Sequence, residues 1–304
     1  MLVALVNPLL GDDLPEDRGA QIYVMNADGT NVRRLGGVPA FRELGSPSYS
    51  PDGSHVVVDA YESDAQFSAA RLLVLDAEGK NPVDLGPGHM PSWSPDGAKL
   101  ACSRMDRDGN WRGVGILDLN NREFRKIAEG AWGIEWSPQG DYVVYLKNGV
   151  VIHELATGNE HRPLANHPEG VDRLHWNMAV SPDGRKMCGK LVLDAGQKHH
   201  AVMLMDLFPA PGADPTPPQI GVQSFVRNRE VWADFAWHPT EPRVVFPMRS
   251  PEHNNTFLLY EFDPAQPDSL KLVSGQPLDR WNQCSTWRPD GKQLLFLSKH
   301  RAKP

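Results

Sequence analysis

Tryptophans interleaved with charged and amide side chains are the residues of this sequence best suited to hold a ligand. A tryptophan ring stacks on apolar surfaces, whereas histidine, arginine, amide and carboxylate groups hydrogen-bond to hydroxyl or charged edges. The candidate ligand-binding residues are Trp132, Trp176, Trp232, Trp281, His89, His175, Asn177, Glu230, Arg280 and Asn282. This mixture is typical of a site for a sugar or a peptide. The alternative, in which the tryptophans only fill an apolar channel, stays open.

Histidines are the residues with the chemistry to bind a metal ion. The candidate ligands of a divalent cation are His199, His200, His253 and Gln283. Adjacent histidines do not readily direct both rings at one ion, and the sequence has no His-x-His pair. Histidines exposed on loops without a metal are therefore the competing explanation, and no cofactor is predicted.

Motifs for catalysis do not occur in the sequence. It contains no GxSxG nucleophile elbow, no HExxH and no glycine-rich phosphate loop, so no catalytic residue is assigned. The three cysteines are an odd number without CxxC spacing. They exclude a disulfide framework and a four-thiolate zinc site.

Composition excludes further classes of protein. The 304 residues carry a net charge of -7 without a cluster of Lys and Arg, which argues against nucleic acid as a partner. No apolar run approaches the ~20 residues of a membrane span. The apolar stretch at residues 1–6 is too short for a signal peptide. Gly and Pro number 27 each, which indicates frequent turns and favours an all-β, soluble protein, expected to be a monomer.

One turn sequence repeats along the chain. An aromatic or apolar residue followed by Ser-Pro-Asp-Gly, or by a variant of it, occurs six times, with prolines at 51, 95, 138, 182, 239 and 289. The spacing, 43 to 57 residues, is close to the ~40 to 50 residues of propeller blades. An apolar run follows each turn, and most copies continue into a second hairpin, as at 22–30 and 72–80. Each repeat is therefore predicted to form four antiparallel strands.

This turn, followed by a strand and an Asp/Asn-Ala-x-Gly hairpin, resembles the TolB-type β-propeller repeat, which is also found in tricorn-like propellers and oligogalacturonate lyases. The resemblance covers residues 21–298 and implies a six-bladed propeller. Residues 21–35 supply an outer strand pair and the sixth turn supplies only an inner pair. The two ends are therefore predicted to complete one blade. The propeller is assigned to residues 19–304, and residues 1–18 are assigned to a peripheral segment.

The two ends of such a propeller differ in the room that they offer. Antiparallel geometry places the tight repeat turns at one end and the long connections, such as 61–70 and 193–200, at the other. The tight turns are expected to leave little room for a site, so the loop face is predicted to be functional. Four tryptophans that precede the repeat turns, at 93, 136, 237 and 287, are interpreted as packing between blades.

The predicted function is non-catalytic binding of a carbohydrate, peptide or partner protein at the mouth of the central channel. The resemblance implies protein partners and an extracytoplasmic, periplasmic location. The alternative is a metal-assisted polysaccharide lyase or hydrolase, because the similar oligogalacturonate lyases hold a metal with His and Gln residues at this mouth. His175 or His89 would then be the base, and Arg280 would stabilise the enolate charge.

Overall fold

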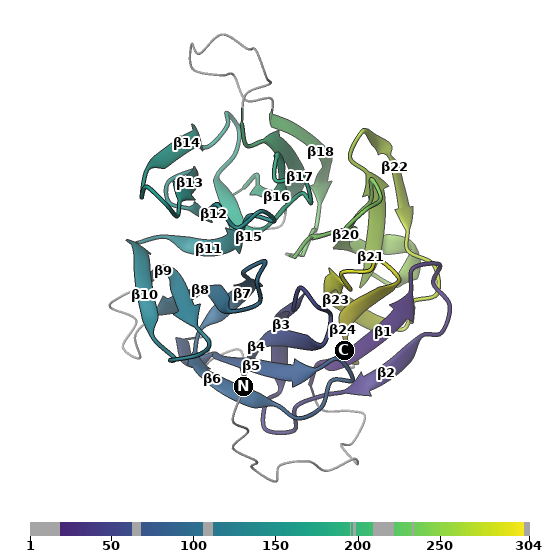
Figure 1. The fold of residues 1–304 in the computed structure, drawn as a ribbon. Helices are drawn as coiled ribbons and strands as arrows, with labels where there is room; N and C mark the ends of the chain where they lie inside the picture. The colour runs from purple at the N-terminus through teal and green to yellow at the C-terminus, as the bar shows by residue number, and fades with distance from the viewer. Residues whose placement is uncertain are drawn as a thin grey trace.

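The structure is a computed structural model that describes residues 19–62, 68–105, 112–194, 196, 199–208, 222–232 and 234–300. Within these residues, 24 strands form six four-stranded antiparallel sheets, arranged as blades around a central channel (Figure 1). The predicted six-bladed propeller is confirmed. The described ranges hold no helix of the length and apolarity that a membrane crossing requires. Residues 1–18, assigned to a peripheral segment, lie outside the described residues.

Five blades run outward from the channel in chain order. The first contains β3 (Glu43–Tyr49), β4 (His55–Tyr61), β5 (Arg71–Asp76) and β6 (Val83–Pro87). The second contains β7 (His89–Trp93), β8 (Lys99–Met105), β9 (Arg112–Asp118) and β10 (Phe124–Glu129). The third contains β11 (Trp132–Trp136), β12 (Tyr142–Leu146), β13 (Val150–Glu154) and β14 (Glu160–Leu164). The fourth contains β15 (Arg173–Val180), β16 (Lys186–Val192), β17 (His200–Asp206) and β18 (Val222–Arg229). The fifth contains β19 (Ala236–Trp237), β20 (Val244–Ser250), β21 (Thr256–Asp263) and β22 (Gln266–Leu272).

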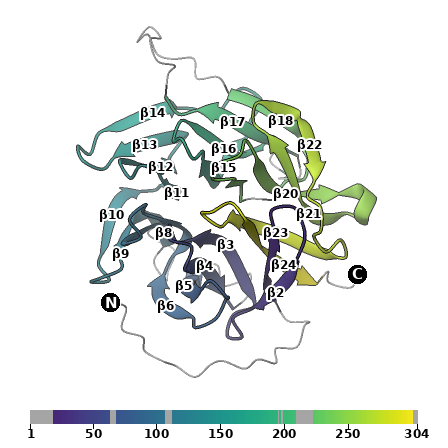
Figure 2. The same cartoon turned by 45° about the vertical axis from the view of Figure 1, so that its right-hand side comes forward.

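The sixth blade joins the two ends of the chain. Its inner strands are β23 (Arg280–Trp287) and β24 (Gln293–His300), and its outer strands are β1 (Gln21–Asn26) and β2 (Arg33–Gly36). β1 and β24 pair antiparallel, with Gln21 opposite Ser298 at one end. The shared blade lies beside the first blade in the ribbon (Figures 1 and 2). The predicted closure is therefore confirmed, and it removes the sheet edge that an open ring would expose.

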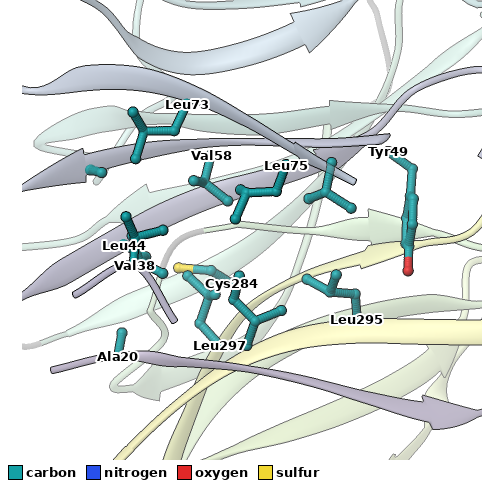
Figure 3. Packing of buried hydrophobic residues seen from close by; sticks show 13 residues of the cluster. Ala20, Val38, Leu44, Tyr49, Val58, Leu73, Leu75, Cys284, Leu295 and Leu297 are labelled. Carbon is teal, nitrogen blue, oxygen red and sulfur yellow. The ribbon is translucent and has the colours of Figure 1, made fainter. Parts of the chain in front are cut away.

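The apolar core lies between the blades. The second strand of a blade is covered on both faces, and in β4 the β-branched run 56–58 is at most 1% exposed. Between the sixth and first blades, Leu44, Leu295 and Leu297 pack around Cys284 (Figure 3). The outer strands β14 and β22 are largely polar and exposed. Because these apolar layers separate neighbouring blades, the central channel is left to accommodate polar side chains.

Two side chains hold the repeated turn closed. Ser94 Oγ donates a hydrogen bond to Asp96 Oδ1 (2.5 Å) and accepts one from the N–H of Lys99 (2.9 Å). Gly97 has a φ of +70°, in the left-handed region that glycine adopts without a steric cost. Equivalent serine and aspartate bonds occur in the first and fourth blades. The Ser-Pro-Asp-Gly signature is therefore a requirement of the turn itself.

Replacement of this serine should destabilise the propeller. Ser94→Ala removes a 2% exposed hydroxyl and leaves the N–H of Lys99 without its partner. We expect the free energy of unfolding to fall by about 1–2 kcal/mol in denaturant titrations. Ser274→Ala, at an exposed position, is the matched control and should change it by less than ~0.5 kcal/mol. Equal effects of the two variants would contradict this role of the serine.

Candidate ligand-binding site

A cavity of about 490 Å³ opens at the loop face, where the inner strands begin. It is termed the mouth cavity. The predicted ligand-binding residues that line it are His175, Asn177, Glu230, Trp232 and Trp281. The predicted metal candidates that line it are His200 and Gln283. Trp176 belongs to β15, and its side chain lies outside what the structure describes. The structure thus brings together seven of the candidates from the fourth and sixth blades and the segment before β19.

Aromatic rings form one wall of the mouth cavity. Trp232 and Trp281 each contact Phe257 edge to face, with ring centroids 5.5 Å and 5.7 Å from it. Phe257 is 1% exposed, whereas Trp232 is 41% exposed. A hydrogen bond from the N–H of Trp232 to the carbonyl of Pro247 (3.0 Å) fixes the backbone of this tryptophan. These three rings, termed the aromatic wall, therefore offer a ligand an exposed ring that is already held in place.

Two ion pairs border the aromatic wall. Arg249 donates to Glu230 through Nε and Nη2, with Nη2 2.8 Å from Oε1. Its guanidinium carbon lies 4.4 Å from the centre of the Phe257 ring. Lys299 Nζ lies 3.2 Å from Glu43 Oε2 and 5.6 Å from the centre of the Trp281 ring. Exposed ion pairs contribute little to stability. Charges of both signs beside an apolar surface instead orient a polar ligand.

Blade 4 supplies basic groups to the same cavity. Lys190 Nζ donates to the carbonyl of Val231 (3.3 Å), and the N–H of Val231 donates to His200 Nδ1 (3.0 Å). Burial, aided by the charge of Arg173, lowers the pKa of Lys190 to about 8. Burial also lowers the pKa of His175 to about 2, with Lys190 as the next cause. His175 is therefore neutral at physiological pH, while most Lys190 side chains are charged.

The mouth cavity continues into the channel. A second cavity, of about 290 Å³, shares four lining residues with it: Ser46, Met90, Asn177 and Asp234. These four residues are termed the waist. Asp234 Oδ1 accepts hydrogen bonds from Asn177 Nδ2 and from Ser46 Oγ (3.5 Å). One carboxylate therefore connects the inner segments of blades 1, 4 and 5, and burial raises its pKa.

A recurring backbone distortion produces the waist. Five residues with positive φ lie three positions before the aromatic residue of the repeat turn: Ser46, Met90, Gly133, Asp234 and Cys284. Pairing shifts register at this point in β3, β7, β11 and β23. Such a bulge redirects a side chain out of the normal alternation of a strand. Non-glycine residues held at positive φ cluster at functional sites, which favours a binding role for the waist.

Two further carboxyl groups surround the channel that were not among the sequence candidates. Asp59 on β4 is 3% exposed, and its Oδ2 accepts a hydrogen bond from the N–H of Met90 (2.9 Å). Glu135 on β11 lines the second cavity. Burial, together with the negative charge of Asp234, raises the pKa of Asp59 to about 7 and that of Glu135 to about 8.

A signal for the missed residues is present in the sequence. Asp59 interrupts the apolar run of a second strand, and Lys190 does so in another blade. Both residues follow the proline of their repeat turn by eight positions. Charged residues are rarely buried without a partner, so this shared position identifies two blades that present charge toward the channel.

Four predicted ligand-binding residues lie outside the mouth cavity lining. Trp132 is 8% exposed, and its ring contacts His89 at a centroid distance of 5.2 Å. Arg280 donates to Ser298 Oγ (3.1 Å), and the same hydroxyl donates to Asn282 Oδ1 (2.8 Å). Arg280 and Asn282 are both buried. Their described contacts connect the inner strands of the sixth blade.

The structure does not gather the four metal candidates around one point. His199 is exposed, and its ring lies 3.2 Å from Asp194. His253 Nδ1 lies 2.8 Å from Ser250 Oγ, and His200 Nδ1 is bound to backbone. In the ranges that the structure describes, no three His, Cys, Asp or Glu side chains are arranged to hold a metal ion. Whether these residues bind a metal is not tested by this arrangement, and the expectation of no cofactor stays a prediction.

The expectation that the turn face leaves little room was wrong. A cavity of about 630 Å³ lies there between blades 4 and 5, lined by Pro182, Met205 and Trp237 among others. A second one, of about 510 Å³, lies between blades 1 and 2. Blades radiate from the channel, so the space between neighbours widens toward the rim and the small turn residues do not fill it. The recurrence at two blade junctions indicates a property of the repeat.

Comparisons with known proteins agree with this architecture. No family model matches the sequence. A solved structure assigned as TolB from Agrobacterium tumefaciens aligns over 93% of this chain and 99% of that chain, with a TM-score of 0.67 and 18% identity. The fold is that of the TolB propellers. TolB of Acinetobacter baumannii aligns over 95% of this chain and 66% of that chain, with a TM-score of 0.58 and 14% identity.

The TolB-type fold is shared with proteins of other functions. An oligogalacturonate lyase solved with manganese aligns over 94% of this chain and 98% of that chain, with a TM-score of 0.51 and 13% identity. Among curated proteins, the uncharacterized peptidase YuxL of Bacillus subtilis is 29% identical over 119 residues. This match spans 35% of this chain and 18% of the peptidase. At these identities the likeness concerns the fold alone.

Proposed function

We propose that the protein is a non-catalytic binding propeller that takes an extended segment of a partner protein at the mouth cavity. The aromatic wall carries this proposal. Its outer ring, Trp232, is 41% exposed beside a cavity of about 490 Å³. Large aromatic side chains that remain exposed on a rigid support are typical anchors of protein interfaces.

The polar groups around the aromatic wall favour a peptide over a neutral sugar. The cavity presents carboxylates, as in Glu43 and Glu230, together with the ammonium of Lys190. A peptide carries charges and backbone donors and acceptors that match both signs, whereas a neutral sugar offers hydroxyl groups only. The extracytoplasmic location, the monomeric state and the lyase or hydrolase alternative stay predictions.

Replacement of the exposed ring should weaken peptide binding. The probe is the tightest binder selected from a random peptide library displayed on phage, prepared as a free peptide. Trp232→Ala should weaken its affinity by about tenfold or more, because a central aromatic anchor contributes ~2 kcal/mol or more to such interfaces. Isothermal titration calorimetry measures the change.

The control replaces another exposed apolar side chain. Leu278 is 44% exposed and does not line the mouth cavity. Leu278→Ala should leave the affinity unchanged, and both variants should keep the melting temperature of the parent. If Trp232→Ala binds the peptide with undiminished affinity, the peptide does not bind at the aromatic wall. If the protein binds a glycan on an array and no peptide is selected from the library, the ligand is a carbohydrate instead of a peptide.

A further inference from the structure

Three carboxyl groups surround the waist. They are Asp59, Glu135 and Asp234, and they are termed the waist carboxyls. None of them forms an ion pair with a Lys, Arg or His side chain of the described residues. Lys190 attracts Asp234 electrostatically, but its ammonium donates to a backbone carbonyl. When these carboxyls ionise, the described neighbours therefore offer their negative charge no paired cation.

One of these groups also has an unused acceptor. Asp59 is 97% buried and lines the mouth cavity, and its Oδ1 has no hydrogen-bond partner among the described residues. This oxygen occupies the space opposite Gly45, where an added Cβ would lie 2.4 Å from it. Only glycine on the inner strand lets the carboxyl reach that place. A buried carboxylate oxygen without a donor is costly, so it requires either a proton or a bound cation.

We infer that the waist is a subsite for an organic ammonium group, such as a lysine side chain carried by the segment that the mouth cavity takes. The segment rests on the proposed function, whereas the ammonium subsite is measured independently of it. An ammonium donates through three N–H groups, which can each bind an oxygen of a different side chain. The aromatic wall at the entrance adds faces that attract a cation.

Chemistry favours the ammonium over a metal ion at this place. A divalent cation needs several converging ligands, and no such group of three is present among the described residues. Asp234 already accepts hydrogen bonds from Asn177, Ser46 and the thiol of Cys284, so the unused acceptor that faces an incoming donor is Asp59 Oδ1. A side chain of four methylene groups has an apolar stem that the aromatic wall can cover while its head reaches the waist.

The subsite should bind more tightly as the pH rises. The charged and titratable groups that line the mouth cavity together with Asp59 and Asp234 are Glu43, Tyr61, His175, Lys190, His200, Glu230, Cys284 and Lys299. Of these, Tyr61 and Cys284 are kept neutral by raised pKa values, since burial disfavours their anions. His175 is neutral as well. Ionisation of the carboxyls near pH 7 and 8 adds negative charge, and loss of the Lys190 proton near pH 8 removes a competing cation.

The experiment compares two small probes of the same shape. Nα-acetyl-lysine amide carries the ammonium, and Nα-acetyl-norleucine amide lacks it. Calorimetry at pH 8.5 should show one equivalent of the lysine probe bound and no binding of the norleucine probe. At pH 6 the carboxyls are largely protonated, so the affinity for the lysine probe should be about tenfold lower, the factor that one pKa unit represents. Binding should also release protons, seen as a heat that depends on the buffer.

Variants locate the subsite. Asp234→Asn keeps the shape, the acceptor oxygen and a residue type that tolerates a φ of +76°, yet removes the charge. This variant should lower the affinity for the lysine probe at least tenfold, and Glu135→Gln should lower it severalfold. Asp263→Asn, on the fifth blade away from the waist, is the matched control and should change nothing. Melting temperatures confirm that each variant is folded.

Three results would overturn the inference: equal binding of both probes, unchanged affinity in folded Asp234→Asn and Glu135→Gln, or displacement of the lysine probe by one equivalent of calcium. Failure of the proposed function looks different. In that case no displayed peptide is selected, or Trp232→Ala has no effect, while the lysine probe still binds at the waist.

Discussion

A chain that ends at Trp287 is expected to lose its cooperative unfolding transition. The truncation removes β24, which pairs with β23 on one side and with β1 on the other. Without it, the outer pair of the sixth blade has no partner, and the apolar layer between the sixth and first blades loses Leu295 and Leu297. Differential scanning calorimetry should show no sharp transition, and the protein should aggregate through its open edges.

A matched pair of substitutions tests the same seam in the full-length chain. Leu295 is 0% exposed in β24, whereas Leu278 is 44% exposed. Leu295→Asp places an unpaired charge in the apolar layer, so it should remove the folded state or lower the melting temperature by more than ten degrees or so. Leu278→Asp should leave the melting temperature nearly unchanged. An intact transition in both the truncated chain and Leu295→Asp would disprove closure through β24.

Neutralising Asp59 is expected to make the free energy of unfolding less dependent on pH between about 4 and 8. Burial raises the pKa of Asp59 to about 7, whereas an unfolded chain has an ordinary aspartate value near 3.9. Between these values the folded state binds more protons, so the free energy of unfolding falls as the pH rises from about 4 to 7. The loss amounts to at most about 4 kcal/mol, and it is complete above pH 8.

The variant Asp59→Asn removes this dependence while its oxygen still accepts from the N–H of Met90. Relative to the parent, its free energy of unfolding should rise by about 2–4 kcal/mol between pH 5 and pH 8. Denaturant titrations at the two pH values give the difference. Asp52→Asn is the control: turn hydrogen bonds, first from Ser50, lower the pKa of Asp52 to about 2, so its contribution is constant above pH 5. A parallel pH dependence of Asp59→Asn and the parent would rule out the cost assigned to this carboxyl.

The fold was predictable because its signals are local. Ser94 and Asp96 bind the backbone of the turn in which they lie, so the turn leaves the same four-residue signature wherever it occurs. Repetition of that signature then determined the number of blades. The closure followed from strand counting, since 21–35 had no inner pair in front of it.

The site was only partly predictable because its geometry depends on distortions that the repeat does not encode. Trp232 and Trp281 line the cavity, whereas Trp132, one residue nearer to its repeat turn than Trp232, is buried. Bulges in the inner strands change which side chain faces the channel, and they leave no fixed residue type behind. Asp59 reaches the cavity only because Gly45 lacks a side chain, a relation between residues fourteen positions apart.

The seam in the sixth blade also determines how the ring responds to tension. Gln21 is opposite Ser298, and the ladder runs from there to Asn26 opposite Gln293. The start of β1 and the end of β24 therefore lie at the same end of this strand pair. A pull on the two ends peels β1 from β24 one pair at a time, instead of shearing all pairs together. The pairing of β1 with β24 that closes the propeller is therefore mechanically weak when both ends of the chain are pulled. Under such a load we expect the sixth blade to separate first, between these two strands.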